Sequence, residues 1–123
     1  MRVCEEIARF ILNNRNLTTE FKQIRHKIDV LVRRLTDNRS LLEERKSLKD
    51  VGRTLYINEL KRKNYQDIFF ANVQRVKESM RVLEEFVKLK NINIAVEFKK
   101  IRYRIYELEK KVVKKLSPLC RYR

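Results

Sequence analysis

Charged and amide side chains recur mostly every third or fourth residue between residues 72 and 89, so they wind along a predicted helix beside its apolar stripe. They are Asn72, Arg75, Glu78, Arg81, Glu84, Glu85 and Lys88. Arginine guanidinium groups bind phosphate through paired hydrogen bonds, and a carboxylate can accept a proton or bind an amine. The pattern permits a phosphate-binding pocket between hairpins, with Glu85 as a catalytic base. Ion pairing between helices, for example of Arg102 with Glu78 or Glu85, explains the same residues, and both interpretations stay open.

A second candidate region is segment 50–54, which contains Gly52, the single glycine of the chain. Loops on a rigid scaffold commonly contact ligands, so we expect Asp50 and Gly52 to do so, with Arg39 and Arg45 nearby. Asp50 would be the metal or proton site if a reaction is catalysed. A phosphotransferase would also need ATP and Mg2+, and with one glycine it would hold phosphate through arginine side chains instead of a glycine-rich loop.

Two blocks of sequence occur twice in the chain and in the same order. Residues 80–86 (MRVLEEF) match residues 1–7 (MRVCEEI), and residues 97–108 (EFKKIRYRIYEL) match residues 20–31 (EFKQIRHKIDVL). The offsets between the copies are 79 and 77 positions, which are nearly equal. We interpret this pattern as an internal duplication of a helical hairpin.

The repeat pairs several candidate site residues with each other. Arg25 corresponds to Arg102, and Arg2 corresponds to Arg81, so we expect either duplicated salt bridges or two related anion sites. His26, the only histidine, corresponds to Tyr103. A position that accepts tyrosine favours a packed aromatic side chain with a polar tip over a catalytic base.

The composition is typical of one all-helical domain, with a single glycine, a single proline and 43% apolar residues. A net charge of +15 fits either an anionic partner or a lysine-rich solvated surface. Cys4 is predicted to be a small core residue, and neither it nor Cys120 has a second thiol or histidine at the spacing of metal ligands. No apolar run or leader indicates a membrane span or secretion, so we expect a cytoplasmic protein. Its Lys, Arg and Glu content fits a thermophilic source.

Apolar spacing of three and four residues predicts helices over about 1–12, from Thr18 or Thr19 onward, from residue 59 or 64 to 89, and over 93–116. A shorter helix over 40–49 would start at a Ser40 capping box, and Ser117-Pro118 would stop the last helix. The predicted fold is all-α, an antiparallel four-helix bundle of two duplicated hairpins. We divide its single domain into hairpin one (1–37), a connector (38–58), hairpin two (59–116) and a tail (117–123).

The first helix is shorter than its counterpart, because Met1 corresponds to Met80 and nothing precedes it. Either the start was assigned at an internal methionine or the protein has a truncated first helix. In the second case we expect Phe69, Phe70 and Val73 to lack cover within the chain. Exposed apolar seams commonly bind a partner, so we predict a homodimer or higher oligomer.

Several blocks, spread in order over nearly the whole chain, carry a resemblance to a known family. They are R-V-x-E-E-x-x-R-F at 2–10, I-R-H at 24–26, D-V-G at 50–52, A-N-x-x-R-x-x-E-x-x-R-V-L-E-E-F-x-K at 71–88 and R-Y-R-x-Y-x-L-E at 102–109. The chain resembles the helical N-terminal domain of the long thiamine-phosphate synthases of cyanobacteria and other bacteria. That family is proposed to include an alternative hydroxymethylpyrimidine-phosphate kinase. The synthase barrel takes about 250 residues, so its coupling chemistry cannot reside in this chain.

The resemblance implies a protein of thiamine biosynthesis that binds or phosphorylates a hydroxymethylpyrimidine phosphate, with Asp50 and Glu85 as catalytic candidates. Arginine and lysine would hold phosphate, and Tyr103 or Tyr106 would stack on the pyrimidine. The binding candidates are Arg25, His26, Arg39, Arg45, Gly52, Asn72, Arg75, Arg81, Lys88, Arg102, Tyr103 and Tyr106. One alternative is a noncatalytic partner of a separate synthase barrel. A nucleic-acid-binding protein is less well supported, because the basic residues are spread over all helices without a recognition motif.

Overall fold

The computed structural model describes residues 1–54 and 57–120, and for residues 38, 58, 59 and 120 it describes the backbone alone. Within these ranges the regular structure is helical, as predicted. The α-helices are α1 (Arg2–Glu6), α2 (Arg15–Leu35), α3 (Asn38–Glu44), α4 (Tyr65–Val87) and α5 (Ile92–Cys120). A π-helical turn (Ile7–Ile11) continues α1, and short 3-10 turns (Ser47–Lys49 and Ile57–Leu60) lie between α3 and α4.

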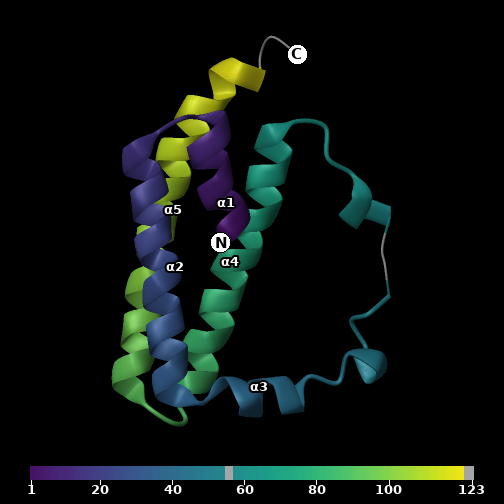
Figure 1. Cartoon of the computed structure of the whole chain (residues 1–123), viewed down its shortest axis with the longest axis vertical. Coiled ribbons are helices and arrows are strands. Elements are labelled where there is room, and N and C mark those ends of the chain that lie inside the picture. Colours follow the sequence, from purple (N-terminus) through teal and green to yellow (C-terminus); the bar gives the residue numbers. More distant parts are fainter. Residues whose placement is uncertain (55–56, 121–123) are drawn as a thin grey trace.

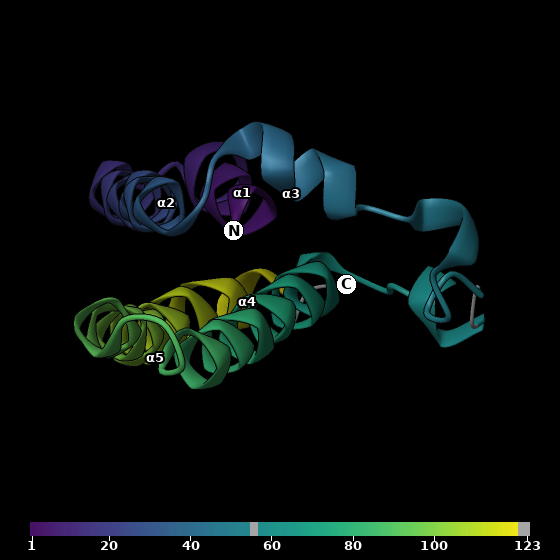
Figure 2. The same cartoon turned by 90° about the horizontal axis from the view of Figure 1, so that it is seen from below.

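The four helices of the body form two layers, with α1 and α2 over α4 and α5 (Figure 2). Within each layer the two helices run in opposite directions, and α2 also runs opposite to α5 (Figure 1). The predicted all-α helical bundle is therefore confirmed. That the two hairpins derive from a duplication stays a prediction.

The core forms where the apolar stripes of the helices meet. Phe21 of α2 and Phe98 of α5, which the repeat pairs, are both 0% exposed. Phe21 packs edge-to-face on Phe69 of α4, with ring centroids 6.5 Å apart. Cys4 is buried with them, as predicted, and burial raises the pKa of its thiol to about 11. This thiol is therefore protonated at neutral pH and poorly reactive.

Asparagine and aspartate side chains cap α2 and α3 upstream of the predicted caps, whereas the first helix ends at an asparagine as predicted. Asn13, with a φ of 48°, ends the first helix in the left-handed region. Asn14 Oδ1 accepts a hydrogen bond from the Leu17 amide at 3.0 Å, so α2 begins before Thr18. Asp37 Oδ1 accepts from the Ser40 amide at 2.6 Å and caps α3, so the predicted Ser40 cap is wrong. A cap three residues upstream satisfies these first-turn amides directly.

The predicted end of the last helix at Ser117-Pro118 is also wrong. Pro118 lies inside α5, which continues to Cys120. The Ser117 hydroxyl donates to the Val113 carbonyl at 2.8 Å, within the helix. Because Pro118 lies in the last turn, its missing N–H removes a hydrogen bond only there. Residues 121–123 of the predicted tail, like residues 55–56 of the connector, lie outside the described residues.

The prediction that Phe69 and Val73 lack cover within the chain is wrong. Both side chains are buried, whereas Phe70 is 40% exposed. The reason is the direction of α1, which runs opposite to α4 and lies beside its first half (Figure 1). Phe69 and Val73 therefore no longer support the predicted oligomer, which stays a prediction.

The segment between α2 and α4 runs outward from the bundle and returns to it (Figures 1 and 2). Between residues 39 and 63, every described side chain whose burial is given is exposed. The segment contains α3 and the short 3-10 turns, and its other described residues lack regular structure.

The core model can be tested by truncating Phe98. Phe98→Ala removes a fully buried ring and leaves a cavity, so we expect a loss of about 3–5 kcal/mol in the free energy of unfolding, measured with urea. Phe86→Ala is the matched control, because Phe86 is 70% exposed and its truncation should change stability by less than about 0.5 kcal/mol. Equal losses in both variants would contradict the assignment of the core.

Candidate functional site

A groove lies between the second half of α4 and the first turns of α5, and we call it the α4–α5 groove. Its volume is about 380 Å3. Its lining residues are Arg81, Glu84, Lys88, Ile92, Ala95, Val96 and Lys99. The α5 residues Ile92, Ala95 and Val96 make one side apolar, and the cations Arg81, Lys88 and Lys99 make the rest basic. Such a surface can accept a flat apolar ring and an anionic group together.

Glu84 is the buried anion of this groove, since only 2% of it is exposed. Its carboxylate accepts hydrogen bonds from Arg102 Nε at 2.8 Å and Nη2 at 3.3 Å, and Arg81 Nη1 donates to it at 3.3 Å. Burial by itself raises the pKa of Glu84. The hydrogen bonds and charge of Arg102, with the charges of Arg81 and Lys88, outweigh burial and hold that pKa below its ordinary value. Glu84 therefore stays ionised and fixes the two arginines.

An aromatic pair continues the site along α5 from Lys99. Tyr103 and Tyr106 are in edge-to-face contact at 5.7 Å between ring centroids. The Arg102 guanidinium lies 5.0 Å from the first ring and 5.8 Å from the second, and its Nη1 donates to the Tyr106 hydroxyl at 2.9 Å. Tyr103 is exposed and can stack on a ligand ring, whereas the Tyr106 hydroxyl is occupied by Arg102.

Glu85, the predicted base, is exposed beside this groove. It accepts a hydrogen bond from Lys88 Nζ at 2.8 Å, and Arg81 Nη1 lies 3.1 Å from it. Lys88 and Arg81 lower the pKa of Glu85. A carboxylate with a lowered pKa is a weak proton acceptor at neutral pH, so the geometry favours a structural role.

The same ion pairs occur in the first hairpin at the positions that the repeat predicts. Arg25 Nε donates to Glu5 at 2.9 Å and its Nη2 donates at 3.4 Å, as Arg102 does to Glu84. Arg2 lies 3.6 Å from Glu5, as Arg81 lies near Glu84. Of the two interpretations of the duplicated arginines, the structure therefore favours duplicated salt bridges. The expected partner of Arg102, Glu78 or Glu85, was wrong, because it is Glu84.

The remaining predicted residues lie elsewhere in the molecule. Asn72 Nδ2 donates to the Ile68 carbonyl at 2.8 Å within α4, and Arg75 is exposed on the same helix. His26 is exposed on α2, so the expectation of a packed side chain is wrong.

The connector holds the other predicted group, and it runs outward from the bundle (Figure 1). Arg39 pairs with Glu43 at 3.2 Å, and Arg45 follows the end of α3. Asp50 Oδ1 accepts from the Gly52 amide at 2.7 Å in an exposed turn. The structure thus brings together Arg81, Lys88, Arg102 and the two tyrosines, but it does not bring the connector residues to them.

Sequence reasoning missed Lys99 and the apolar side of the groove. Val96, Lys99 and Tyr103 follow one another at steps of three and four on α5, a signal that could have placed Lys99 beside the predicted Tyr103. Ile92 had no such signal, because it contributes only once α5 is packed against Lys88 of α4.

The groove lacks free carboxylates for the Mg2+ that a phosphotransferase would need. Its carboxylate Glu84 and the neighbouring Glu85 are both occupied by arginine or lysine, in basic surroundings. Oxygen ligands in such surroundings do not fit Mg2+. Across residues 1–54 and 57–120, no three or more His, Cys, Asp or Glu side chains gather where they could hold a metal ion. No helix in the same ranges is long and apolar enough to cross a membrane.

Comparison with known proteins decides the family. The ThiD2 family model matches residues 1–111. The chain belongs to the ThiD2 family. The resemblance predicted from the sequence blocks is thereby confirmed.

Curated relatives of this ThiD2-family chain carry the name thiamine-phosphate synthase. That of Synechocystis sp. is 37% identical over 116 residues, which cover 89% of this chain and 31% of the relative. That of Nostoc punctiforme is 36% identical, with 89% and 30% covered, and that of Rhodopirellula baltica is 33% identical, with 97% and 32% covered. The chain thus spans about a third of the length of these relatives. No solved structure matches the chain.

Replacing Glu84 by glutamine tests the buried pair. At pH 7 we expect Glu84→Gln to lower the free energy of unfolding by about 3 kcal/mol, because Arg102 loses its counter-charge. The matched control Glu85→Gln removes a half-exposed partner and should cost less than about 1 kcal/mol.

The same variant gives a pH test of known sign. A folded-state pKa below the ordinary 4.5 stabilises the fold above that pH, and this contribution is lost as the pH falls through the folded-state pKa. The difference in unfolding free energy between the native chain and Glu84→Gln should therefore shrink from pH 7 to pH 3. A difference that is constant with pH would contradict the assignment.

Proposed function

We propose that the α4–α5 groove binds a phosphorylated pyrimidine and that the chain acts in thiamine biosynthesis in the cytoplasm. The observation that carries the proposal is an apolar wall facing a row of cations within one groove of ligand size. The names of the relatives support the choice of ligand, since they are thiamine-phosphate synthases.

In this proposal the phosphate ester lies among Arg81, Lys88 and Lys99. Arg81 supplies paired donors, and the lysines supply point charges. Arg81 Nη1 lies 3.3 Å from the Glu84 carboxylate and 3.1 Å from that of Glu85. These ion pairs limit the rotamers of Arg81 before a ligand binds. The pyrimidine ring lies on Val96 and its neighbours, with exposed Tyr103 at the far end.

Removing Lys99 tests the ligand contact. We expect Lys99→Ala to weaken the binding of hydroxymethylpyrimidine phosphate about tenfold, because a charge-assisted hydrogen bond to phosphate is lost. Isothermal titration calorimetry measures the affinity. Lys100→Ala is the matched control, since this neighbour pairs with Glu97 and does not line the groove. Unchanged binding in Lys99→Ala, or equal losses in both variants, would contradict the proposal.

Phosphoryl transfer is a finer form of the same proposal and needs a separate assay. The protein is incubated with hydroxymethylpyrimidine phosphate, ATP and Mg2+, and phosphorus NMR follows the formation of a diphosphate ester. The Mg2+ would be held by the ATP phosphates, because the carboxylates of the groove are paired with arginine and lysine. Turnover that Lys99→Ala lowers and Lys100→Ala preserves would assign a kinase to this groove. Binding without turnover would assign a binding protein.

A second candidate function is that of a noncatalytic partner of a separate synthase barrel. The observation that favours it is an exposed apolar ridge on α4 and just after it, formed by Val82, Phe86 and Leu89 and called here the α4 ridge. Such ridges commonly contact other proteins. The chain also matches only about a third of the length of each relative, so in those proteins the matched region is joined to further protein.

The α4 ridge can be tested by adding a charge. We expect Phe86→Glu to abolish co-purification with a separately expressed thiamine-phosphate synthase barrel, because a carboxylate would be desolvated in the interface. Val30→Glu places the same charge on exposed α2 and serves as the control. Failure of the native chain to co-purify with the barrel would dismiss this candidate and leave the ligand-binding proposal untouched.

A further inference from the structure

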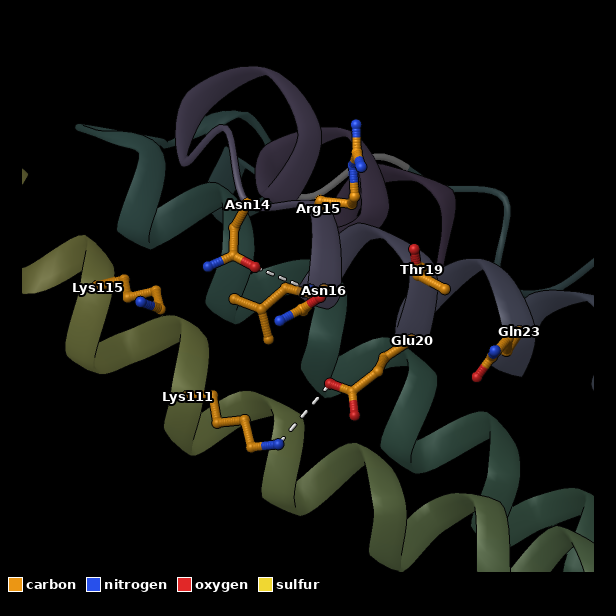
Figure 3. A pocket seen from close by; sticks show the side chains of 9 residues that line it. Asn14, Arg15, Asn16, Thr19, Glu20, Gln23, Lys111 and Lys115 are labelled. Atoms are coloured by element: carbon orange, nitrogen blue, oxygen red, sulfur yellow. Dashed lines mark hydrogen bonds and ion pairs between the residues drawn. The ribbon is translucent and has the colours of Figure 1, made fainter.

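A second hollow lies between the first turns of α2 and the later part of α5, and we call it the α2–α5 hollow. Its volume is about 570 Å3. In Figure 3, Asn16 and Glu20 of α2, with Asn14 just before it, extend toward Lys111 and Lys115 on α5, whereas the Arg15 side chain lies at the edge and points away from these lysines. Because none of these residues lines the α4–α5 groove, the two sites are separate.

The charge of the α2–α5 hollow is strongly unbalanced. Its lining contains the cations Arg15, Lys111 and Lys115 and a single carboxylate, Glu20, from which Lys111 Nζ is separated by 3.8 Å. Among the residues that the structure describes, the side chains of Arg15 and Lys115 have no hydrogen-bond or ion-pair partner. Lys111 and Lys115 are four residues apart and therefore point from successive turns of α5 to the same side. Converging cations of this kind attract an anion.

A neighbouring hollow extends this basic region around the N-terminal end of α2. It shares Asn14, Arg15 and Thr19 with the α2–α5 hollow and adds Arg9. Arg15 thus stands between two concave surfaces that are both lined by donors. The basic region consists of side chains from three segments of the chain, so it does not depend on the helix end alone.

The second hairpin shows that a helix start of this kind forms without Arg15 and Thr19. With an offset of 77, Asn14 corresponds to Asn91, and both asparagines cap their helix, with bonds of 3.0 and 3.2 Å. At two exposed positions that follow, however, Arg15 corresponds to Ile92 and Thr19 to Val96, whereas Asn16 corresponds to Asn93. The same helix start therefore forms with apolar residues there. The side chains of Arg15 and Thr19 are therefore available to bind a ligand.

We infer that the α2–α5 hollow binds a small anion with more than one phosphate group. Inorganic pyrophosphate is the simplest member of this class. One phosphate would fill only a small part of the hollow, and three cations exceed what one phosphate needs. The amides of Asn14 and Asn16 and the hydroxyl of Thr19 add uncharged hydrogen-bonding groups around the cations.

Titration with pyrophosphate tests this inference on the full chain. It is followed by calorimetry and by amide NMR at about 0.15 M salt, where screening weakens nonspecific attraction. We expect the shifts to concentrate at residues 14–20 and 111–115. Lys115→Ala should weaken binding about tenfold through the loss of a charge-assisted contact. Lys114→Ala, which removes the same charge from an exposed neighbour outside the hollow, should leave it unchanged.

A second variant separates binding from folding. Arg15→Ile introduces the residue found at the equivalent position of α5, so thermal unfolding should stay as in the native chain while pyrophosphate binding weakens. Several results would overturn the inference: no binding of pyrophosphate, shifts confined to the α4–α5 groove, or equal losses in Lys114→Ala and Lys115→Ala. Inorganic phosphate that binds as tightly as pyrophosphate would overturn the assigned ligand class.

Discussion

A buried carboxylate in each hairpin imposes the constraint on which the rest of the bundle depends. Glu5 and Glu84 are withdrawn from water, at a cost of several kcal/mol for each ion unless a partner compensates. Arg25 and Arg102 compensate through two hydrogen bonds each. A slip of one helix by one turn, about 5.4 Å, would leave a buried charge unpaired. The pairs thus fix how α2 lies along α1 and how α5 lies along α4.

The fixed register has consequences for the candidate site. Arg81 and Lys88 belong to α4, whereas Lys99 and Val96 belong to α5, so the shape of the α4–α5 groove depends on how the two helices are aligned. Arg102 also orients Tyr106 directly. One interaction therefore sets the positions of both the cations and the apolar wall of the groove before any ligand is bound.

Features that depend on the periodicity of side chains were predictable from the sequence. Features that depend on competition between neighbouring capping residues, or on the direction of a helix, were not. Burial of a stripe that contains Phe21 or Phe98 requires a helix, so these helices and the bundle were predictable. The choice of Asn14 instead of Thr18 as the cap of α2 was not predictable. Both residues can accept an amide hydrogen bond, and only the path of the backbone decides between them. The cover over Phe69 depends on the direction of α1, which periodicity does not encode.

The same division explains the candidate site. Arg81, Lys88 and Arg102 were found because each lies at a regular step beside an apolar stripe. Asp50 was chosen because Gly52 marks a loop, but the path of a connector whose described side chains are exposed has no periodic signal. The wall formed by Ile92 and its neighbours exists only across two helices, so it needs the tertiary structure.

The described residues between α2 and α4 run outward from the bundle. The covalent link between the hairpins is therefore separate from the packing that holds the hairpins together. Every described side chain between residues 39 and 63 whose burial is given faces water, so these side chains add little buried apolar surface between the layers. Loop closure entropy grows only slowly with length, so lengthening this stretch costs the bundle little. It is therefore the natural place for the architecture to accept an inserted domain, a proteolytic nick or new chain ends by circular permutation, while the helices stay in register.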